Sequence, residues 1–295
     1  MPASEGALRA LLAEFGVHPK KSLGQNFMHD PVWLQRVADA AAVSSGDVVL
    51  EVGAGAGGLT RVLADRARHV VALEIDSRLL PMLERELTGF TNVTVVEGDV
   101  LALNVQPYLA LHLVAPESRF AVVANIPYYI TGAILRQLLS SAFRPERLVL
   151  TVQSEVADRI AAEPDDMSLL AVSVQYYGLP RIVARVPAGA FYPRPEVNSA
   201  IVRIDVNSAA TRRAEDEKWF FRVARAGFSR KRKQLQNSLA GGLGLTRDPV
   251  QRALEAAGVD PRRRAETLSV AEWQRVSERL REIPAAQAAN ELTGG

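Results

Sequence analysis

The chain has 295 residues, of which 48% are hydrophobic, so it can bury a full core and is long enough to divide into two domains. It has no cysteine, which excludes disulfides and thiolate catalysis, and its four histidines lack the spacing of metal ligands. No apolar run reaches the roughly 18 residues of a membrane span, and the N-terminal stretch lacks the apolar segment of a secretion signal. We therefore expect a cytoplasmic globular protein with no metal and no membrane association.

The formal net charge of +2 conceals an uneven distribution of charge. Between Lys218 and Arg247 there are eight basic residues and no acidic one, with "RKRK" (230–233) in the middle. Such a block is typical of proteins that bind a phosphate backbone. The alternative interpretation is a solvated helix face, which is what many charge runs are.

Short, valine-rich segments alternate with helical patterns along the first half of the chain. Strands are expected at 47–52, 69–75, 92–99, 120–126 and 147–153. This alternation predicts an α/β fold with a mostly parallel sheet and helices on both faces, a Rossmann-like arrangement.

The region after Gln153 is expected to complete the sheet. "SEVADRIAAE" predicts a helix, "SLLAVSVQYY" a helix or a strand, and "RIVARVP" and "SAIVRIDV" predict two further strands, seven in all. The polar stretch "NSAATRRAED" (207–216) is followed by helix formers without a strand candidate. We therefore expect an α/β domain over 1–206 and a smaller all-helical domain over 207–295, with a flexible tail from about 284.

The first predicted strand leads into "GAGAGG", in which Gly53, Gly55 and Gly58 fit the pattern G-x-G-x-x-G before a helix. Glycines let the backbone turn sharply and approach a ligand, and the helix N-terminus favours an anion. Glu74 ends the second strand, where a carboxylate can accept hydrogen bonds from ribose hydroxyls. The pattern predicts a cofactor that contains a nucleoside and leaves NAD and S-adenosylmethionine both open. The alternatives are a plain glycine-rich turn and a solvated glutamate.

Two further strand ends carry polar residues. Asp99 follows the third strand, where a carboxylate could accept from the amino group of adenine or simply cap the next segment. The fourth strand runs into "NIPYYI" (125–130), which is either part of a site or an ordinary turn. The glycine loop, Glu74, Asp99 and "NIPY" together resemble the class I S-adenosylmethionine methyltransferases that modify the N6 amino group of adenine.

This resemblance implies the catalytic roles. Asn125 Oδ1 and the Ile126 carbonyl would accept hydrogen bonds from the N6 amino group, which is a poor nucleophile because its lone pair is delocalised into the ring. Pro127 would fix the turn, and Tyr128 would stack on the base. Rate would come from positioning and electrostatic preorganisation rather than from a strong base.

Seven blocks in order extend the resemblance over nearly the whole chain. They are "KSLGQNF", "EVGAGAGGLT", "NIPYYI", "VQSEVADRI", "FYPRPEVNSAIVRI", "FSRKRKQLQNSL" and "GVDPRRRAETLS". Together they are similar to the KsgA/RsmA family, which dimethylates two adjacent adenosines near the 3′ end of small-subunit (16S) ribosomal RNA during ribosome biogenesis. The resemblance implies a monomeric enzyme that acts on the immature small subunit and converts S-adenosylmethionine to S-adenosylhomocysteine.

The resemblance also implies the binding residues. In the family, an N-terminal arm, here residues 1–30, folds over the cofactor. The implied cofactor-binding residues are Gln25, Asn26, Met28, Gly53, Gly55, Glu74, Ile75, Asp99 and Asn125. Phe191, in "FYPRP", could stack on the target base opposite Tyr128, as flipped bases are held, or could anchor a turn in a core. The implied RNA-phosphate contacts are Arg230, Lys231, Arg232 and Lys233.

The sequence departs from the family pattern at five places, one of which is Met28, which replaces the usual leucine with comparable apolar bulk. Ala54 stands where proline is usual, Ser154 where lysine is frequent and Asn198 where aspartate is frequent. Residues 163–170 lack the Tyr-Gly pair often found there. Ser154 and Asn198 could alter RNA contacts or only local hydrogen bonds, and we expect no substrate-loop function at 163–170.

Three rival functions share some of these motifs. The macrolide-resistance enzymes, which methylate large-subunit (23S) ribosomal RNA, share the cofactor motifs and "NIPY", but "GVDPRRRAETLS" favours the small-subunit enzymes. A non-enzymatic nucleic-acid-binding protein on the same scaffold would not need an intact Asn125. An NAD dehydrogenase would use the glycines and Glu74 but leave "NIPYYI" and the basic block without a role.

Overall fold

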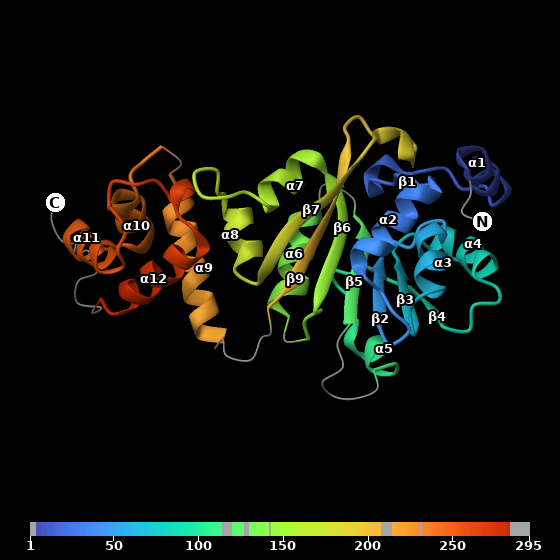
Figure 1. Cartoon of the computed structure of the whole chain (residues 1–295), viewed down its shortest axis with the longest axis horizontal. Coiled ribbons are helices and arrows are strands. Elements are labelled where there is room, and N and C mark those ends of the chain that lie inside the picture. The colour runs from blue at the N-terminus through green and yellow to red at the C-terminus, as the bar shows by residue number, and fades with distance from the viewer. Residues whose placement is uncertain are drawn as a thin grey trace, which may run out of the picture. The chain divides into compact units, whose positions relative to one another are not determined.

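The computed structural model describes residues 4–113, 120–126, 130–141, 143–207, 214–230 and 232–283. The chain divides into two compact units. The first comprises Met1–Asp158 and Gly178–Ser208, and the second comprises Arg159–Tyr177 and Ala209–Gly295. The first unit contains the β-strands, whereas the described part of the second is helical (Figure 1).

A seven-stranded sheet in the order β4-β3-β2-β5-β6-β9-β7 forms the centre of the first unit. Neighbouring strands from β4 to β6 are parallel, whereas β9 is antiparallel to both β6 and β7. The strands are β2 (Val48–Val52), β3 (His69–Glu74), β4 (Val93–Glu97), β5 (Phe120–Asn125), β6 (Arg147–Gln153), β7 (Gly178–Val186) and β9 (Ser199–Val206). The mostly parallel, seven-stranded sheet predicted from the sequence is confirmed.

The sequence of β2 explains its central place in the sheet. All five residues of "VVLEV" are buried, as is typical of a parallel strand covered on both faces. Strand order runs outward from β2 through β3 to β4, and in the other direction through β5 to β6. Connections therefore leave β2 and β5 in opposite directions, which opens a crevice at their carboxyl ends.

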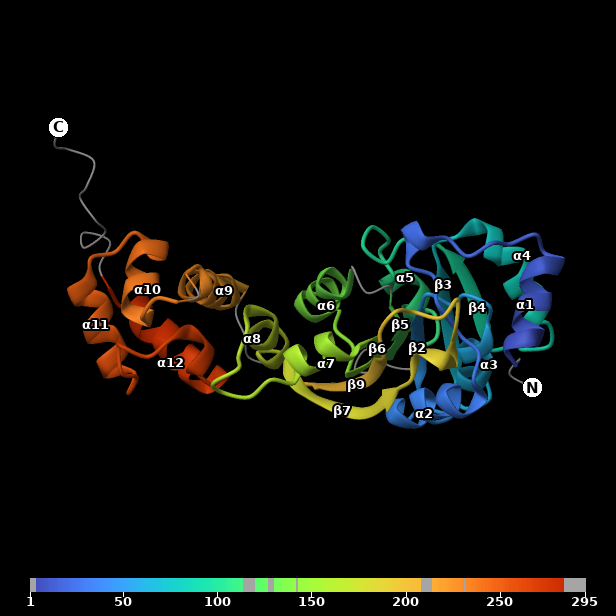
Figure 2. The same cartoon turned by 90° about the horizontal axis from the view of Figure 1, so that it is seen from above.

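Helices cover both faces of this sheet. In Figure 2, α2 (Pro31–Ala41) and α6 (Thr131–Ser140) lie on opposite faces. The start of α2 is set by Asp30, whose carboxylate accepts a hydrogen bond from the Val32 N–H at 2.9 Å, with proline at the first helical position. The remaining elements of this unit outside the arm are α3 (Gly58–Ala64), η2 (Ser77–Leu79), α4 (Leu80–Glu86), α5 (Gln106–Ala110), η4 (Ala188–Ala190) and α7 (Ser154–Ile160), which ends in the second unit.

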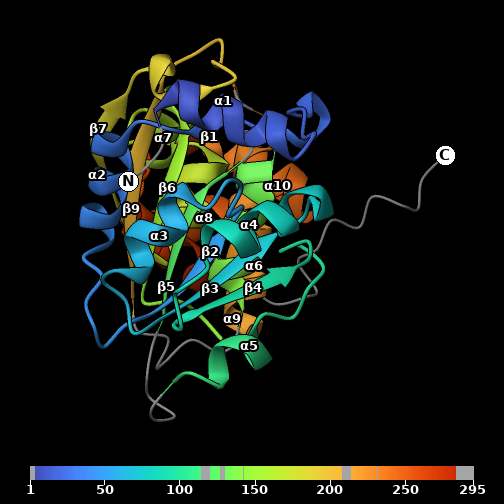
Figure 3. The same ribbon diagram turned by 90° about the vertical axis from the view of Figure 1, so that its right-hand side faces the viewer.

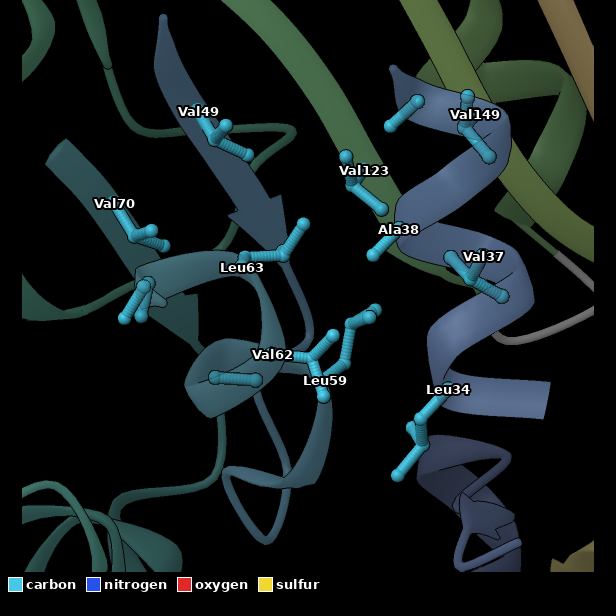
Figure 4. Packing of buried hydrophobic residues seen from close by; sticks show 14 of the residues in the cluster. Leu34, Val37, Ala38, Val49, Leu59, Val62, Leu63, Val70, Val123 and Val149 are labelled. Atoms are coloured by element: carbon cyan, nitrogen blue, oxygen red, sulfur yellow. The ribbon is translucent and has the colours of Figure 1, made fainter. Parts of the chain in front are cut away.

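One hydrophobic core of the first unit lies between the sheet and the helices α2 and α3. Figure 4 shows Val37 of α2 and Leu63 of α3 facing Val49, Val123 and Val149 of three neighbouring strands. All five side chains are fully buried. Burying a side chain of this kind is worth about 1.5–3 kcal/mol, so this layer fixes the strands whose ends carry the site.

The N-terminal arm, residues 4–30, packs on the end of the first unit. Leu8 and Leu12 of α1 (Glu5–Glu14) form a small core with Met82 of α4, and Figures 1 and 3 show these two helices side by side. The arm continues through η1 (Lys21–Leu23) to β1 (Phe27–Met28), which pairs antiparallel with β8 (Phe191–Tyr192). The arm is therefore tied to the "FYPRP" loop by backbone pairing.

The second unit is a group of helices packed around aromatic side chains. Trp273 of the last described helix is fully buried against Gly227 of the helix at 214–228. A Cβ added to Gly227 would lie only 2.3 Å from the Trp273 ring, so the two helices can pack this closely only because residue 227 is glycine. Ser269 and Glu272 form a capping box that starts the last helix. Its elements are α8 (Leu169–Gln175), α9 (Ala214–Phe228), α10 (Leu235–Leu243), α11 (Arg247–Ala256), η5 (Ala265–Thr267) and α12 (Val270–Arg281).

The division of the chain differs from a single boundary at 206/207. Residues 159–177 belong to the second unit, because Tyr176, which follows α8, stacks on Phe220 of α9 with ring centroids 4.1 Å apart. "SLLAVSVQYY", for which helix and strand were both open, is helical over Leu169–Gln175. The tail from about 284 lies outside the described residues.

Candidate active site

A cavity opens at the carboxyl ends of the parallel strands in the first unit. Gly53 follows β2, Glu74 ends β3, Asp99 follows β4 and Asn125 ends β5. This is the edge, beside the reversal of strand order, where open α/β sheets bind ligands. The lining residues are Leu23, Gly24, Gln25, Asn26, Phe27, Val52, Gly53, Gly55, Leu73, Glu74, Ile75, Leu79, Gly98, Asp99, Val100, Asn125, Ile126, Ile130 and Ile134.

The glycine loop and Glu74 hold each other in place. Gly55 has φ +58° and donates its backbone N–H to Glu74 Oε2 at 2.8 Å, while the Asp76 N–H donates to Oε1 at 2.9 Å. Burial is the largest influence on Glu74 and raises the pKa of its carboxyl; these backbone donors oppose that rise. A Cβ on Gly55 would lie 3.0 Å from the Phe27 ring, so a side chain there would crowd the arm that closes the loop.

The ends of β3 and β4 bring a carboxylate and an apolar side chain to the same cavity. Asp99 Oδ1 accepts from the Leu101 N–H at 2.8 Å, so the capping role left open by the sequence is present. Oδ2 is the oxygen that can receive an amino group. Ile75 is 50% exposed beside it, and an exposed apolar side chain next to a carboxylate suits a purine ring with an exocyclic amine.

Gln25 fastens the arm across the mouth of the cavity. Its Nε2 donates to Asp76 Oδ2 at 2.8 Å, and its Oε1 accepts from the Lys20 N–H at 2.8 Å. Asp76 also pairs with Arg78 at 2.5 Å, and this guanidinium is the main reason that the pKa of Asp76 is lowered to about 2. Both the oxygen and the nitrogen of the Gln25 amide therefore bond to the protein. We call the Gln25–Asp76 hydrogen bond, which holds the arm at the cavity, the latch.

The orientation of the Asn125 amide is fixed by the arm. Asn125 Nδ2 donates to the Asn26 backbone carbonyl at 2.9 Å. A carbonyl oxygen only accepts, so the nitrogen of the amide must face it. This leaves Oδ1 as an acceptor at the edge of the cavity, which is the role the sequence predicts for Asn125.

The rest of the "NIPY" turn is only partly described. Ile126 is 2% exposed and lines the cavity. Pro127 and Tyr128, predicted to fix the turn and stack on the base, lie outside the described residues. Their roles stay predictions.

Two predicted residues lie away from this cavity. Met28, in β1, lines an adjoining cavity instead. Phe191 is 2% exposed in the core of the first unit, paired through β8 with Met28. Of the two interpretations of Phe191, this arrangement fits the turn anchor and gives no surface for base stacking, because the ring fills a packed core.

The sequence analysis missed several apolar residues of the cavity. Val100, Ile130 and Ile134 line it with Leu23 of the arm. The position of Val100 beside Asp99 could have suggested the first. The other two follow "NIPYY" at a spacing that only the folded start of α6 brings to the cavity.

The basic block lies in the second unit between α9 and α10. Arg230, Arg232 and Lys233 are exposed and form none of the ion pairs found among the described residues, and Lys231 lies outside them. The arginines of "GVDPRRRAETLS" differ, because each pairs with a carboxylate: Arg262 with Asp260, Arg263 with Glu272 and Arg264 with Glu266. Unpaired exposed cations are the ones available for phosphate.

Three of the departures from the family pattern have local explanations. Asn198 Oδ1 accepts from the Ala188 N–H at 3.0 Å, and Ser154 Oγ donates to the Ser199 carbonyl at 3.0 Å. In the 163–170 segment, the N–H groups of Asp165 and Met167 both donate to the Glu266 carbonyl. These contacts account for the three sites as local hydrogen bonds.

Two kinds of feature are absent from the described residues. Within them, no helix is both long and apolar enough to cross a membrane. The same residues contain no group of three or more histidine, aspartate or glutamate side chains arranged to hold a metal ion.

The doubly wound sheet, the glycine loop with Glu74, and the amide at the end of β5 define a class I methyltransferase. The family model for ribosomal RNA adenine dimethylase matches residues 16–282, and the chain belongs to this family of enzymes. Sequence and structure both place it among enzymes that methylate RNA.

Curated relatives and solved structures agree with this family. The chain is 45% identical to ribosomal RNA small subunit methyltransferase A of Moorella thermoacetica, over 94% of this chain and 98% of that one. It is 42% identical to the protein of the same name from Geobacillus thermodenitrificans, over 94% and 96%.

Two solved structures share the fold. The 23S rRNA methyltransferase ErmE is 31% identical with a TM-score of 0.70, covering 87% of this chain and all of that one. A dimethyladenosine transferase from Plasmodium falciparum is 26% identical with a TM-score of 0.71, covering 84% and 94%. Identity is thus higher to the two small-subunit methyltransferases than to the 23S rRNA methyltransferase.

Proposed function

We propose that this chain uses S-adenosylmethionine to dimethylate the N6 atoms of two adjacent adenosines near the 3′ end of small-subunit (16S) ribosomal RNA, during biogenesis of that subunit. The observation that carries the proposal is the Asn125 amide, fixed by the Asn26 carbonyl with Oδ1 left as an acceptor at the strand-end cavity. The curated relatives at 42–45% identity carry the name of a small-subunit methyltransferase, which favours this RNA.

The cavity fits the proposed cofactor. Glu74, held by two backbone donors, retains lone pairs for ribose hydroxyls, and Asp99 with Ile75 suits the adenine ring. Gly53 and Gly55 let the backbone approach the ligand closely. When bound, S-adenosylmethionine supplies an electrophilic methyl group, and S-adenosylhomocysteine remains.

The residues of the chain prepare the nucleophile. Asn125 Oδ1 and the Ile126 carbonyl accept hydrogen bonds from the N6 amino group, which draws its lone pair out of conjugation with the ring. Pro127 and Tyr128 complete the turn and hold the base by stacking. A neutral amide also serves the second methylation, because the monomethylated nitrogen still has one N–H to donate.

Binding of RNA is assigned to the second unit. Arg230, Arg232 and Lys233, which are exposed and form no ion pair with another described residue, contact phosphates together with Lys231, so they position the RNA and do not read its bases. The proposed division of labour is catalysis within residues 1–206 and RNA binding by 207–295; residues 159–177, which belong to the second unit, are given no part in the RNA contacts. The proposal further includes a monomeric, cytoplasmic protein whose substrate is the immature small subunit.

The role of Asn125 is tested with Asn125→Ala, and with Asn104→Ala as a matched loss of a carboxamide that only caps the Gln106 N–H. We expect Asn125→Ala to lose nearly all methyl transfer while binding of RNA is retained, and Asn104→Ala to remain active. Normal turnover by Asn125→Ala would contradict the assigned role.

The RNA contacts are tested by changing the four residues of the basic block to alanine. We expect weaker RNA binding with a shallower salt dependence, because each phosphate contact in a duplex contributes a slope of roughly −0.9. The control is Arg262→Ala with Arg264→Ala, since both arginines are paired with carboxylates. An unchanged slope in the four-residue variant would contradict the phosphate contacts and favour the interpretation of the block as a solvated surface.

A further inference from the structure

A second cavity adjoins the proposed cofactor site in the first unit. The two cavities share Phe27, Gly53, Gly55 and Asn125, so only the glycine loop, the arm and the proposed catalytic amide separate them. The second cavity reaches inward to Glu51, the last residue but one of β2. Neither the sequence patterns nor the proposed function gives Glu51 a role.

Polar atoms without partners point to this region from several elements. Glu51 is 1% exposed, and its Oε2 has no hydrogen-bond partner among the residues that the structure describes. Within the same part of the chain, the hydroxyls of Thr60 in α3 and Thr151 in β6, and Nε2 of His29, are also buried without a hydrogen-bond partner. Buried polar atoms are rarely left unpaired, so a cluster of them beside a ligand cavity indicates a functional constraint.

The charges around Glu51 do not compensate its carboxylate. Glu74 of β3 adds a second negative charge nearby. Arg61 of α3 lines the cavity but is paired with Glu86 of α4 at 3.2 Å, and His29 lies 3.9 Å from the exposed Glu5 carboxylate of α1.

A carboxylate that is buried without a cation is unstable as an anion. Burial is the main reason that the pKa of Glu51 rises to about 8; the nearby Glu74 also raises it, and the Thr60 hydroxyl, outside normal hydrogen-bond geometry, only partly opposes the rise. In the free protein at neutral pH, Glu51 is therefore mainly an uncharged acid. A positively charged ligand bound beside the residues that the two cavities share would favour the ionised form of Glu51.

We propose that Glu51 is a specificity-determining residue of the cofactor site: it is an uncharged acid in the free protein and releases its proton when a positively charged ligand binds. The inference rests on the proposed use of S-adenosylmethionine. That cofactor carries one more positive charge, on sulfur, than S-adenosylhomocysteine. Ionised Glu51 therefore favours the charged cofactor over its spent product, and this preference grows as pH rises toward 8.

The test is calorimetric titration of the whole chain with each of the two ligands, in buffers of different ionisation enthalpy at pH 7. We expect proton release to approach one per S-adenosylmethionine bound and to be smaller for S-adenosylhomocysteine. Glu51→Gln should abolish the difference between the ligands and reduce the preference for the charged one several-fold. Glu86→Gln, which removes a paired carboxylate from the same cavity, should leave the difference in proton release and the preference for the charged ligand unchanged.

The outcomes separate the two levels of the proposal. Equal proton release by the parent chain and Glu51→Gln would overturn the role of Glu51 and leave the cofactor assignment intact. Failure of the parent chain to bind either ligand would overturn the cofactor assignment and the inference with it. The parent chain alone gives a check that needs no variant, since a preference that is flat from pH 6 to 8 would also overturn the inference.

Discussion

Replacing Glu51 by glutamine removes a buried titratable proton from β2 with almost no change in side-chain size. In the folded chain the pKa of Glu51 is about 8, whereas its ordinary value is 4.5. A group with a raised folded pKa contributes stability that is fully present below its unfolded pKa and is lost as pH rises toward the folded one. For Glu51 this window extends from about pH 4.5 to 8.

The expected change in the free energy of unfolding follows from the folded and ordinary pKa values of Glu51. One pKa unit is worth about 1.4 kcal/mol, so at pH 7 ionisation of Glu51 in the unfolded chain favours unfolding by roughly 3 kcal/mol, against about 1 kcal/mol at pH 5. Between pH 5 and 7, glutamine should therefore gain roughly 2 kcal/mol relative to the parent chain. Effects of the amide that do not depend on pH cancel in this difference.

The assay is urea unfolding at both pH values, followed by circular dichroism, on the parent chain, Glu51→Gln and Glu86→Gln. Glu86 is the control, since it lines the same cavity but is paired with Arg61. If the free energies of unfolding of Glu51→Gln and the parent chain change in parallel between pH 5 and 7, Glu51 is not an uncharged acid in the folded chain.

Three further substitutions test the packing and the site. Gly227→Ala should destabilise the second unit by about 1–3 kcal/mol in urea unfolding, because the new Cβ would lie 2.3 Å from Trp273, and should leave cofactor affinity in calorimetry unchanged. Gly55→Ala should weaken cofactor binding at least tenfold in the same calorimetry, since its φ is +58° and Phe27 blocks the side chain; unchanged affinity would contradict the proposed loop contact. Asp76→Asn should raise the KM for the cofactor in methyl-transfer kinetics more than it lowers kcat, because it loosens the arm; a loss confined to kcat would argue against the latch.

The fold could be predicted well because its signals are local. Valine-rich segments gave the strands, and the glycine loop with Glu74 gave the edge of the sheet where the cavity lies. The position of α8 could not be predicted, since its place in the second unit depends on the stacking of Tyr176 on Phe220, far apart in sequence.

The residues of the site could be predicted only where a local motif marks them. Asn125 is marked by its motif, but the carbonyl that orients its amide belongs to Asn26 in the N-terminal arm, far from it in sequence. Phe191 stands in an aromatic loop that could face a ligand or a core, and only the folded chain shows it buried. Glu51 looks like an ordinary strand residue in "VLEV", because nothing local reveals that it lacks a partner.

The most direct test of the account is incubation of the purified chain with labelled S-adenosylmethionine and, separately, unmethylated small and large ribosomal subunits, followed by identification of the labelled nucleoside by mass. The account predicts N6,N6-dimethyladenosine in the small subunit only. Label confined to the large subunit, or absent from both, would contradict it.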